Sequence, residues 1–207
     1  MNTIRALYTS LCALLFPLTD TVRLVSEASS ESVGRLLSPV MLSSHITGLS
    51  PYRHPVIRAL IIEAKFHKNQ IAYAHLAEIL EDYIETIDSD RAAFSDASML
   101  LVPIPLSTGR KRERGYNQVE EVLKHVSRNT DVHLLVRTEE TLPQTSLSRK
   151  ERLQNVVGAF GVVGTIDPHA LYVVIDDVTT TGATLQEACE TLRRAGATEV
   201  YGVALAH

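Results

Sequence analysis

The second half of the chain alternates between short apolar runs and longer segments with apolar residues at helical spacing. The apolar runs predict strands, because a run of about four to eight apolar residues suits a strand buried on both faces. The amphipathic segments between them predict helices. The predicted strands are residues 99–105, 131–137, 159–164, 171–176 and 199–206, and the predicted helices are residues 117–129 and 184–196. Strands that alternate with helices indicate an α/β fold with a mostly parallel sheet.

The first third of the chain is dominated by helical spacing. Apolar residues recur every three or four positions in residues 4–15, 56–67 and 71–87, so we predict a helix in each segment. Residues 18–53 give no clear pattern, and residues 88–98 form a turn-rich connector. We therefore predict two regions, which are a helical N-terminal region over residues 1–95 and an α/β core over residues 96–207.

The composition is that of a folded globular protein with little net charge. The 207 residues are 45% apolar and 21% charged, and the net charge is −4. Residues 101–160 differ from the rest, because they contain ten Lys and Arg against seven Asp and Glu. This local excess of positive charge indicates either a binding site for an anion or a solvated basic loop.

The two cysteines of the chain indicate whether it binds zinc, and its apolar N-terminal stretch indicates where in the cell the protein is found. Cys12 and Cys189 cannot build a zinc ribbon or a disulfide framework, so we expect no bound zinc. Cys189 falls on the apolar face of the predicted helix 184–196, as a core residue would. Residues 4–18 are too short to span a bilayer, include Arg5 and lack a cleavage site. We expect a cytoplasmic protein that does not bind a membrane.

The stretch VVIDDVTTTGATL, residues 173–185, places two acids and a small hydroxyl-rich loop after a predicted strand. Ligands of parallel sheets bind beyond the carboxyl ends of the strands, where Asp176 and Asp177 fall. Gly182 permits a tight loop, and the helix that follows offers backbone N–H groups to an anion. Two carboxylates that can accept hydrogen bonds from hydroxyl groups, next to a site for an anion, indicate a sugar phosphate as the ligand. Neither a G-x-x-x-x-G-K-[ST] nor a G-x-G-x-x-G motif follows a strand, which argues against a P-loop nucleotidase and against dinucleotide binding.

Several stretches resemble one family of proteins. VVIDDVTTTGATL resembles the 5-phosphoribosyl-1-pyrophosphate (PRPP) signature of type I phosphoribosyltransferases. LVPIPLSTGRKRERGYNQ, residues 101–118, resembles the P-x-P … R-x-R-G-[YF]-N-Q block of the ComF family, the phosphoribosyltransferase-like competence proteins. Residues 135–160 and 58–69 are similar to two further blocks of that family, the second being a helix with a hydrophobic-L-K-[YF] pattern. The resemblance covers the chain from about residue 50 onward.

The resemblance implies a fold, a reaction and a set of site residues. The fold is that of type I phosphoribosyltransferases, with the N-terminal region as a helical hood over the sheet edge. Asp176 and Asp177 would bind the ribose hydroxyls of PRPP as the catalytic pair, and Mg²⁺ would bind through PRPP oxygens without ligands from the protein. The reaction would displace pyrophosphate with a nitrogen nucleophile from an unknown acceptor. The 5′-phosphate would be bound by Thr179, Thr180, Thr181, Gly182, Ala183 and Thr184.

Two segments are candidates for binding the pyrophosphate. One is the loop after the first core strand, with Leu106, Ser107 and Thr108, as the fold implies. The other is the long loop over residues 138–155, which would act as a lid. Its cations could contact pyrophosphate or simply be solvated, and they are Arg149, Lys150 and Arg152.

The basic run at residues 110–114 leaves a second function open. It could contact pyrophosphate, or it could bind single-stranded DNA with Tyr116 stacking on a base. The chain is therefore either an active phosphoribosyltransferase or a non-catalytic protein of the same fold that binds DNA or competence proteins, or senses PRPP. One departure from the family stands out. Its members commonly carry paired cysteines of a small zinc module near the N-terminus, and residues 18–50 contain no cysteine. A zinc role is therefore not carried over.

Overall fold

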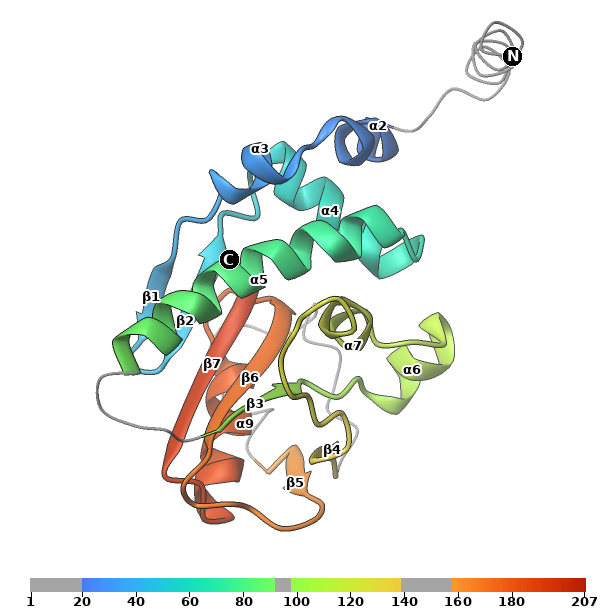
Figure 1. The fold of residues 1–207 in the computed structure, drawn as a ribbon. Helices are drawn as coiled ribbons and strands as arrows, with labels where there is room; N and C mark the ends of the chain where they lie inside the picture. Colours follow the sequence, from blue (N-terminus) through green and yellow to red (C-terminus); the bar gives the residue numbers. More distant parts are fainter. Residues whose placement is uncertain (1–19, 92–97, 139–157) are drawn as a thin grey trace, which may run out of the picture.

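A five-stranded sheet forms the centre of the protein (Figure 1). The computed structural model describes residues 20–91, 98–138 and 158–207, so the predicted helix 4–15 lies outside the described residues. The strand order is β1-β2-β7-β6-β3, and every neighbouring pair is parallel except β1 with β2. The predicted α/β class with a mostly parallel sheet is therefore confirmed. The strands of this sheet are β1 (Val40–Ser43), β2 (Ile46–Ser50), β3 (Met99–Pro103), β6 (Leu171–Val178) and β7 (Glu199–Ala206).

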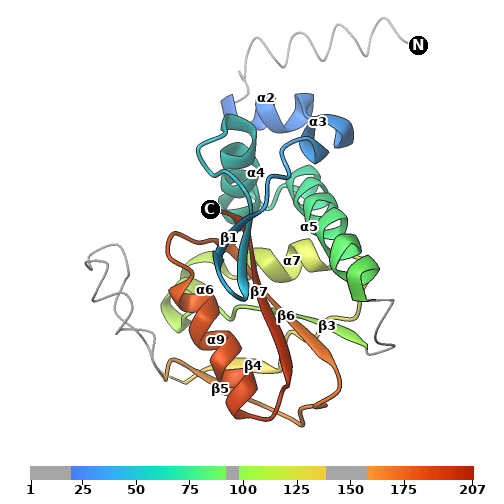
Figure 2. The ribbon, with the colours of Figure 1, turned by 90° about the vertical axis from the view of Figure 1, so that its left-hand side faces the viewer.

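Helices cover both faces of the sheet. Figure 2 shows α9 on one side of the strands and α5 on the other. The apolar run of β6 fits this arrangement, because successive side chains of a strand point to opposite faces. Val173 and Ile175 belong to the hydrophobic cluster that includes α4 and α5, whereas Tyr172 and Val174 belong to the cluster that includes α9. The helices are α2 (Asp20–Glu27), α3 (Ser30–Gly34), α4 (Pro55–Phe66), α5 (Gln70–Arg91), α6 (Thr108–Arg114), α7 (Gln118–Leu123) and α9 (Ala183–Arg194).

Three of the predicted helices are confirmed, and a fourth is shorter than predicted. Helices α4, α5 and α9 match the segments with clear apolar spacing. The predicted helix 117–129 is wrong beyond Leu123, where α7 ends. The residues that follow turn back toward β3, since the N–H of Leu101 donates to the carbonyl of Asn129 at 2.9 Å and the N–H of Asp131 donates to the carbonyl of Leu101 at 3.0 Å. Backbone pairing with β3 thus replaces the last turns of the helix.

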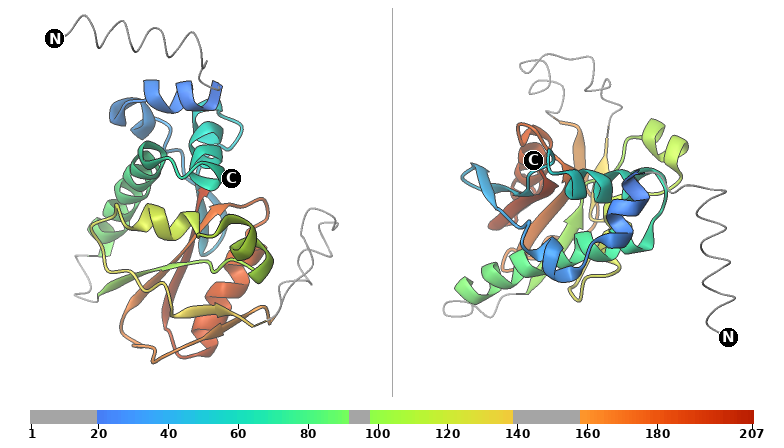
Figure 3. Two further views of the ribbon diagram at one scale, coloured as in Figure 1. Left: turned by 90° about the vertical axis from the view of Figure 1, so that its right-hand side faces the viewer. Right: turned by 90° about the horizontal axis from the view of Figure 1, so that it is seen from above.

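Two predicted strands lie outside the main sheet. β4 (Leu135–Arg137) and β5 (Phe160–Val162) pair with each other as a separate antiparallel sheet. Their places in the main sheet are taken by β1 and β2, from the segment 18–53 that gave no clear pattern. Figure 3 shows the blue-to-teal helices α2 to α4 above the sheet, near the end of β7. The division at residues 95 and 96 stays a prediction, and β2 of the first region pairs directly with β7 of the second.

Candidate functional site

A cavity of about 430 Å³ opens at the carboxyl ends of β3 and β6. It is bounded by the loop after each of these strands, by the start of α7 and by the last turn of α4. Parallel α/β sheets bind their ligands at this edge. The residues that line the cavity are Lys65, Ile104, Pro105, Leu106, Ser107, Arg110, Asn117, Gln118, Val119, Arg137, Asp176, Asp177, Val178, Thr179, Thr180, Thr181, Ala183 and Thr184.

Asp177 is held in place by side chains from two different helices. Its Oδ2 lies 2.8 Å from the Nζ of Lys65 on α4 and accepts a hydrogen bond from the Nε2 of Gln118 on α7 at 2.5 Å. Its Oδ1 accepts the backbone N–H of Val178 at 2.7 Å. Asp177 is only 6% exposed, so a carboxylate there requires such partners. These three contacts therefore fix the orientation of the Asp177 side chain before any ligand arrives.

Asp176 has different surroundings. It precedes Asp177 in β6, so its side chain starts toward the opposite face of the sheet. Its Oδ1 accepts the backbone N–H of Asp177 at 2.9 Å. Burial and the charge of Asp177 raise the pKa of Asp176 to about 7, although the backbone N–H of Asp177 and the charges of Lys65 and Arg110 act in the opposite direction. Asp176 thus holds a proton more readily than an ordinary aspartate.

The loop after β6 is shaped by its own hydroxyl groups. The Oγ1 of Thr179 accepts the N–H of Gly182 at 2.9 Å, and the N–H of Thr179 donates to the carbonyl of Ala206 at 3.0 Å. Gly182 has φ of +75°, which favours glycine, and a Cβ there would lie 3.2 Å from Cγ2 of Ile46. The loop delivers the N-terminus of α9 to the cavity, where Ala183 and Thr184 form part of the lining. Backbone N–H groups at a helix start favour an anion there.

Two arginines supply positive charge to the same cavity. Arg110 comes from α6 and Arg137 from β4. The Nε of Arg137 donates to the carbonyl of Pro105 at 3.2 Å, and its guanidinium lies 5.0 Å from the ring centroid of Phe160. Burial lowers the pKa of Arg137, the charge of Arg110 lowers it further, and Asp176 raises it. Two guanidinium groups that repel each other across a cavity favour an anionic ligand between them.

The structure brings most of the predicted site residues together. Both aspartates line the cavity, together with Leu106, Ser107 and the loop residues Thr179, Thr180, Thr181, Ala183 and Thr184. Gly182 is not part of the lining, but its positive φ and its hydrogen bond to Thr179 shape the loop. Thr108 is the first residue of α6 and is not part of the lining, because the predicted pyrophosphate loop ends at the N-cap Ser107. The three predicted cations Arg149, Lys150 and Arg152 lie outside the described residues.

Sequence reasoning missed four polar residues of the lining. Lys65, Asn117, Gln118 and Arg137 all reach the cavity. All four stood inside stretches already given for their resemblance to the ComF family, so a signal was present. Arg137 ends a predicted strand, which is a second signal. Asn117 also has a structural task, since its Nδ2 donates to the carbonyl of Ile104 at 3.0 Å and its Oδ1 caps α7.

The basic run beside the cavity is only partly available to a large ligand. Lys111 and Arg112 are exposed on α6. Tyr116 is half-buried, its hydroxyl donates to the carbonyl of Ala64 at 3.0 Å, and the Nζ of Lys68 lies 4.7 Å from its ring centroid. Tyr116 therefore packs between α4 and α7, and the base-stacking role considered for it does not fit this position.

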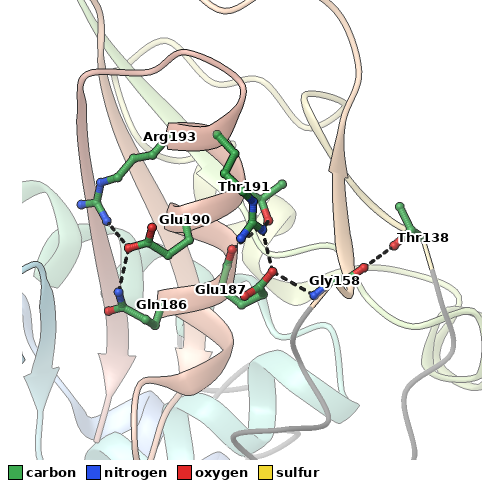
Figure 4. Close-up of polar contacts among 8 residues, drawn as sticks. Thr138, Gly158, Gln186, Glu187, Glu190, Thr191 and Arg193 are labelled. Atoms are coloured by element: carbon green, nitrogen blue, oxygen red, sulfur yellow. Dashed lines mark hydrogen bonds and ion pairs between the residues drawn. The ribbon is translucent and has the colours of Figure 1, made fainter.

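A hydrogen-bond network on α9 anchors the neighbouring small sheet (Figure 4). Glu187 is 8% exposed, and its Oε1 accepts the N–H of Gly158 at 3.0 Å and the guanidinium of Arg194 at 2.7 Å. The hydroxyl of Thr138 donates to the carbonyl of Gly158 at 2.7 Å. The network thus connects Gly158, just before β5, to α9, the helix whose N-terminus lies at the cavity.

The described ranges contain neither a cluster of metal ligands nor a membrane-spanning helix. No three His, Cys, Asp or Glu side chains in these ranges gather as metal ligands. Within residues 20–91, 98–138 and 158–207, no helix is long and apolar enough to cross a bilayer. Cys189 is a buried core residue, as predicted, and burial raises its pKa to about 12.

Comparisons with known proteins identify the family of the chain. It is 33% identical over 155 residues to competence protein F of Haemophilus influenzae, an overlap that covers 71% of this chain and 67% of that protein. It is 29% identical over 150 residues to the DNA utilization protein YhgH of Escherichia coli K12, covering 70% of this chain and 65% of that protein. The chain thus spans about two thirds of the length of these relatives.

The comparisons with family models and with solved structures do not contribute to this assignment. No family model matches the chain. Among solved structures, it is similar to a hypoxanthine phosphoribosyltransferase from Staphylococcus aureus with a TM-score of 0.39 and 11% identity, over 66% of this chain and 63% of that one. The assignment rests on the sequence relatives, and by its similarity to competence protein F the chain belongs to the ComF family.

Proposed function

We propose that the protein binds PRPP together with Mg²⁺ and transfers its phosphoribosyl group to an acceptor with release of pyrophosphate. One observation carries the proposal: two carboxylates and a helix-starting anion loop line the same cavity at the carboxyl end of β6. A sugar phosphate needs both, because its hydroxyls require acceptors and its phosphate requires N–H donors. Membership of the ComF family is established by sequence.

Each part of the cavity has a task in this proposal. Asp176 and Asp177 accept hydrogen bonds from the ribose hydroxyls. The loop over residues 179–184 and the start of α9 hold the 5′-phosphate. Arg110 and Arg137 bind pyrophosphate, together with the loop that contains Ser107. The described cations thus provide an alternative to the predicted pyrophosphate contacts of the 138–155 loop.

The reaction requires positioning and charge stabilisation from these side chains. A bond forms between the acceptor nitrogen and the anomeric carbon of ribose, the bond to the pyrophosphate oxygen breaks, and the acceptor gives up a proton. Positive charge develops on the sugar and negative charge on the leaving group, so carboxylates below the ribose and guanidinium groups at pyrophosphate lower the barrier. When bound, Mg²⁺ supplies further charge neutralisation to pyrophosphate. Asp177 Oδ2 is already engaged by Lys65 and Gln118, which fits a metal held by PRPP oxygens.

A second candidate function is a binding protein of the same fold without transferase activity. The names of the relatives refer to competence and DNA utilization. Lys111 and Arg112 are exposed beside the cavity and could meet a nucleic acid backbone. Under this alternative, PRPP is sensed rather than consumed, or single-stranded DNA and competence proteins are the partners. A cytoplasmic location and the absence of zinc stay predictions.

Calorimetry with PRPP and Mg²⁺ tests the proposal directly. Asp177→Asn keeps the size of the side chain but removes the charge that Lys65 and the ribose hydroxyls require. We expect the Kd for Mg·PRPP to rise by at least about tenfold, because a hydrogen bond to a charged group is worth about 1.5–3 kcal/mol. Asp88→Asn is the matched control, since Asp88 pairs with Arg128 on the surface and not at the cavity.

The outcomes separate the candidate functions. Unchanged affinity in a folded Asp177→Asn variant contradicts the site. Tight binding of Mg·PRPP that is followed by pyrophosphate release with nucleobases or amines supports transferase activity. Tight binding without any release supports the PRPP sensor.

A further inference from the structure

The ring of Phe66 at the end of α4 is exposed, yet it has a charged partner. The side chain is 57% exposed, although phenylalanine is usually among the buried residue types. The guanidinium of Arg114, the last residue of α6, lies 5.4 Å from the centroid of the ring, which is an attractive cation–π contact. Lys65, the residue before Phe66, forms the ion pair with Asp177. The exposed ring thus lies next in sequence to a side chain of the cavity.

Arg114 also contacts a residue of the cavity. Its Nη1 donates to the Oε1 of Gln118 at 3.2 Å, and the Nε2 of Gln118 donates to the Oδ2 of Asp177 at 2.5 Å. The lining of the cavity includes Gln118 and Asp177, but it does not include Arg114. A guanidinium outside the lining is therefore connected to the carboxylate through one amide group.

The segment 114–118 is held against the last turn of α4 by two side chains. Arg114 lies over the ring of Phe66, and the hydroxyl of Tyr116 donates to the carbonyl of Ala64 at 3.0 Å. The same turn of α4 supplies the lysine that pairs with the carboxylate at the end of β6. Both contacts therefore fix the segment relative to the site.

A left-handed glycine brings Arg114 and Gln118 together. Gly115 caps α6 with φ of +75°, a conformation that favours glycine. The next helix, α7, begins at Gln118, only three residues later. The tight turn between the two helices thus places the last side chain of α6 beside the first side chain of α7.

The contact with Arg114 decides which way the amide of Gln118 faces. A side-chain amide has an oxygen that accepts hydrogen bonds and an NH₂ group that donates them, whereas an ionised carboxylate can only accept. If the Oε1 of Gln118 turned toward Asp177, two acceptors would meet. A guanidinium can only donate, so Arg114 keeps Oε1 on its own side and leaves Nε2 for the carboxylate.

We propose that Arg114 is a positioning residue for Asp177, and that it acts through the amide of Gln118 rather than by contact with a ligand. The inference rests on the proposed function, in which Asp177 accepts hydrogen bonds from the ribose. It separates Arg114 from Arg110, which belongs to the same basic run but lines the cavity itself. The exposed ring of Phe66 helps to hold the guanidinium in place.

A double-mutant cycle measured by calorimetry with Mg·PRPP tests the connection. Arg114→Met and Gln118→Met are made singly and together, because methionine keeps an unbranched side chain but donates no hydrogen bond. Arg128→Met is the matched control, since Arg128 pairs with Asp88 at the surface. Circular dichroism establishes that each variant is folded.

We expect Gln118→Met to raise the Kd for Mg·PRPP by at least about tenfold, because a donor to a charged acceptor is lost. Arg114→Met should raise it by at least about threefold in the unsubstituted background, but by less than about twofold in the Gln118→Met background, where the connecting amide is absent. Arg128→Met should leave the Kd unchanged. An equal effect of Arg114→Met in both backgrounds would mean that Arg114 contacts the ligand itself, and no effect in either would mean that it positions nothing. Both results overturn the inference.

A second measurement requires no ligand. The side-chain NH₂ resonances of Gln118 in a ¹H–¹⁵N spectrum, assigned by their loss in Gln118→Met, should move in Arg114→Met and stay in place in Arg128→Met. Arg114→Gln replaces Arg114→Met in both measurements if the latter does not fold. Resonances that stay in place in the arginine variant overturn the inference. Resonances that move, in a protein that fails to bind Mg·PRPP, support the contact and overturn the proposed function instead.

Discussion

Asp176 and Asp177 are neighbours in the chain, but they differ in what their carboxyl groups contact. Asp177 is paired with Lys65 and with Gln118. Asp176 is half-buried beside that charge, and its pKa is raised to about 7 by desolvation and by Asp177. One strand therefore ends in one fixed carboxylate and one carboxyl group that changes its protonation near neutral pH.

Asp176→Asn is expected to change how stability depends on pH. The pKa of Asp176 is about 7 in the folded protein and about 3.9 in an unfolded chain. Between these values the folded state binds a proton that the unfolded state has released, so Asp176 lowers the free energy of unfolding as the pH rises from about 4 to about 7. The Tm of Asp176→Asn relative to the unsubstituted protein should therefore increase between about pH 5 and about pH 8.

Thermal unfolding followed by circular dichroism measures this difference. Asp88→Asn serves again as the control, because Asp88 is an exposed partner of Arg128. A Tm difference for Asp176→Asn that is the same at both pH values would show that the pKa of Asp176 is not raised.

At the scale of single elements, α9 links two parts of the site. Its N-terminus forms the anion loop, and one turn further on Glu187 accepts the N–H of Gly158 and the guanidinium of Arg194 (Figure 4). Glu190 lies three residues later on the same helix and pairs with Arg193 at 3.0 Å, but it is 42% exposed. The helix thus offers one buried and one exposed glutamate in comparable ion pairs.

Glu187→Gln is expected to lower the free energy of unfolding by about 1–3 kcal/mol, because a buried charged acceptor is removed from two donors. Glu190→Gln, the matched control, should change it by no more than about 0.5 kcal/mol, as is usual for an exposed ion pair. Urea denaturation gives both values. Equal effects of the two substitutions would mean that the contact between Glu187 and Gly158 adds nothing to stability.

The same element shows what a sequence can predict. β6 and α9 are specified by local patterns, namely an apolar run, two acids, a glycine and helical apolar spacing, and all of these lie within residues 171–194. β2 is five residues long and contains Thr47, Gly48 and Ser50, so its apolar signal is weak. Its pairing with β7 joins segments that are about 150 residues apart, and no local pattern encodes this. The site follows the same rule. The aspartates were found from their neighbours in sequence, but Lys65 meets Asp177 only through the packing of α4.

At the scale of the whole molecule, the close contact of three elements depends on Gly202 in β7. A Cβ at this position would lie 2.5 Å from Cδ1 of Ile46 on β2, 3.2 Å from Cβ of Leu185 and 3.3 Å from Sγ of Cys189, both on α9. Because glycine has no side chain, Ile46 of β2 and the helix α9 can both pack closely against β7 in the centre of the sheet.

Gly202→Ala is expected to lower the free energy of unfolding by about 1–3 kcal/mol, because overpacking forces neighbouring side chains from their positions. Gly109→Ala is the control, since a Cβ at Gly109 meets nothing within 4 Å and Gly109 lies within α6. That control should be neutral or more stable by about 0.5–1 kcal/mol. Chemical denaturation compares the two variants, and an unchanged midpoint for Gly202→Ala would contradict the close packing.

The place of β7 in the sheet has a consequence for how the protein folds. β7 lies between β2 and β6, yet it follows both in the chain. During synthesis, the N-terminal helices and β2 leave the ribosome long before residues 199–206, so the two halves of the sheet cannot join until that last strand arrives. Until then β2 and β6 each present an open edge and an apolar face, the features that lead folding intermediates to aggregate. The joining step closes a very long loop, and we therefore expect slow folding that benefits from chaperones.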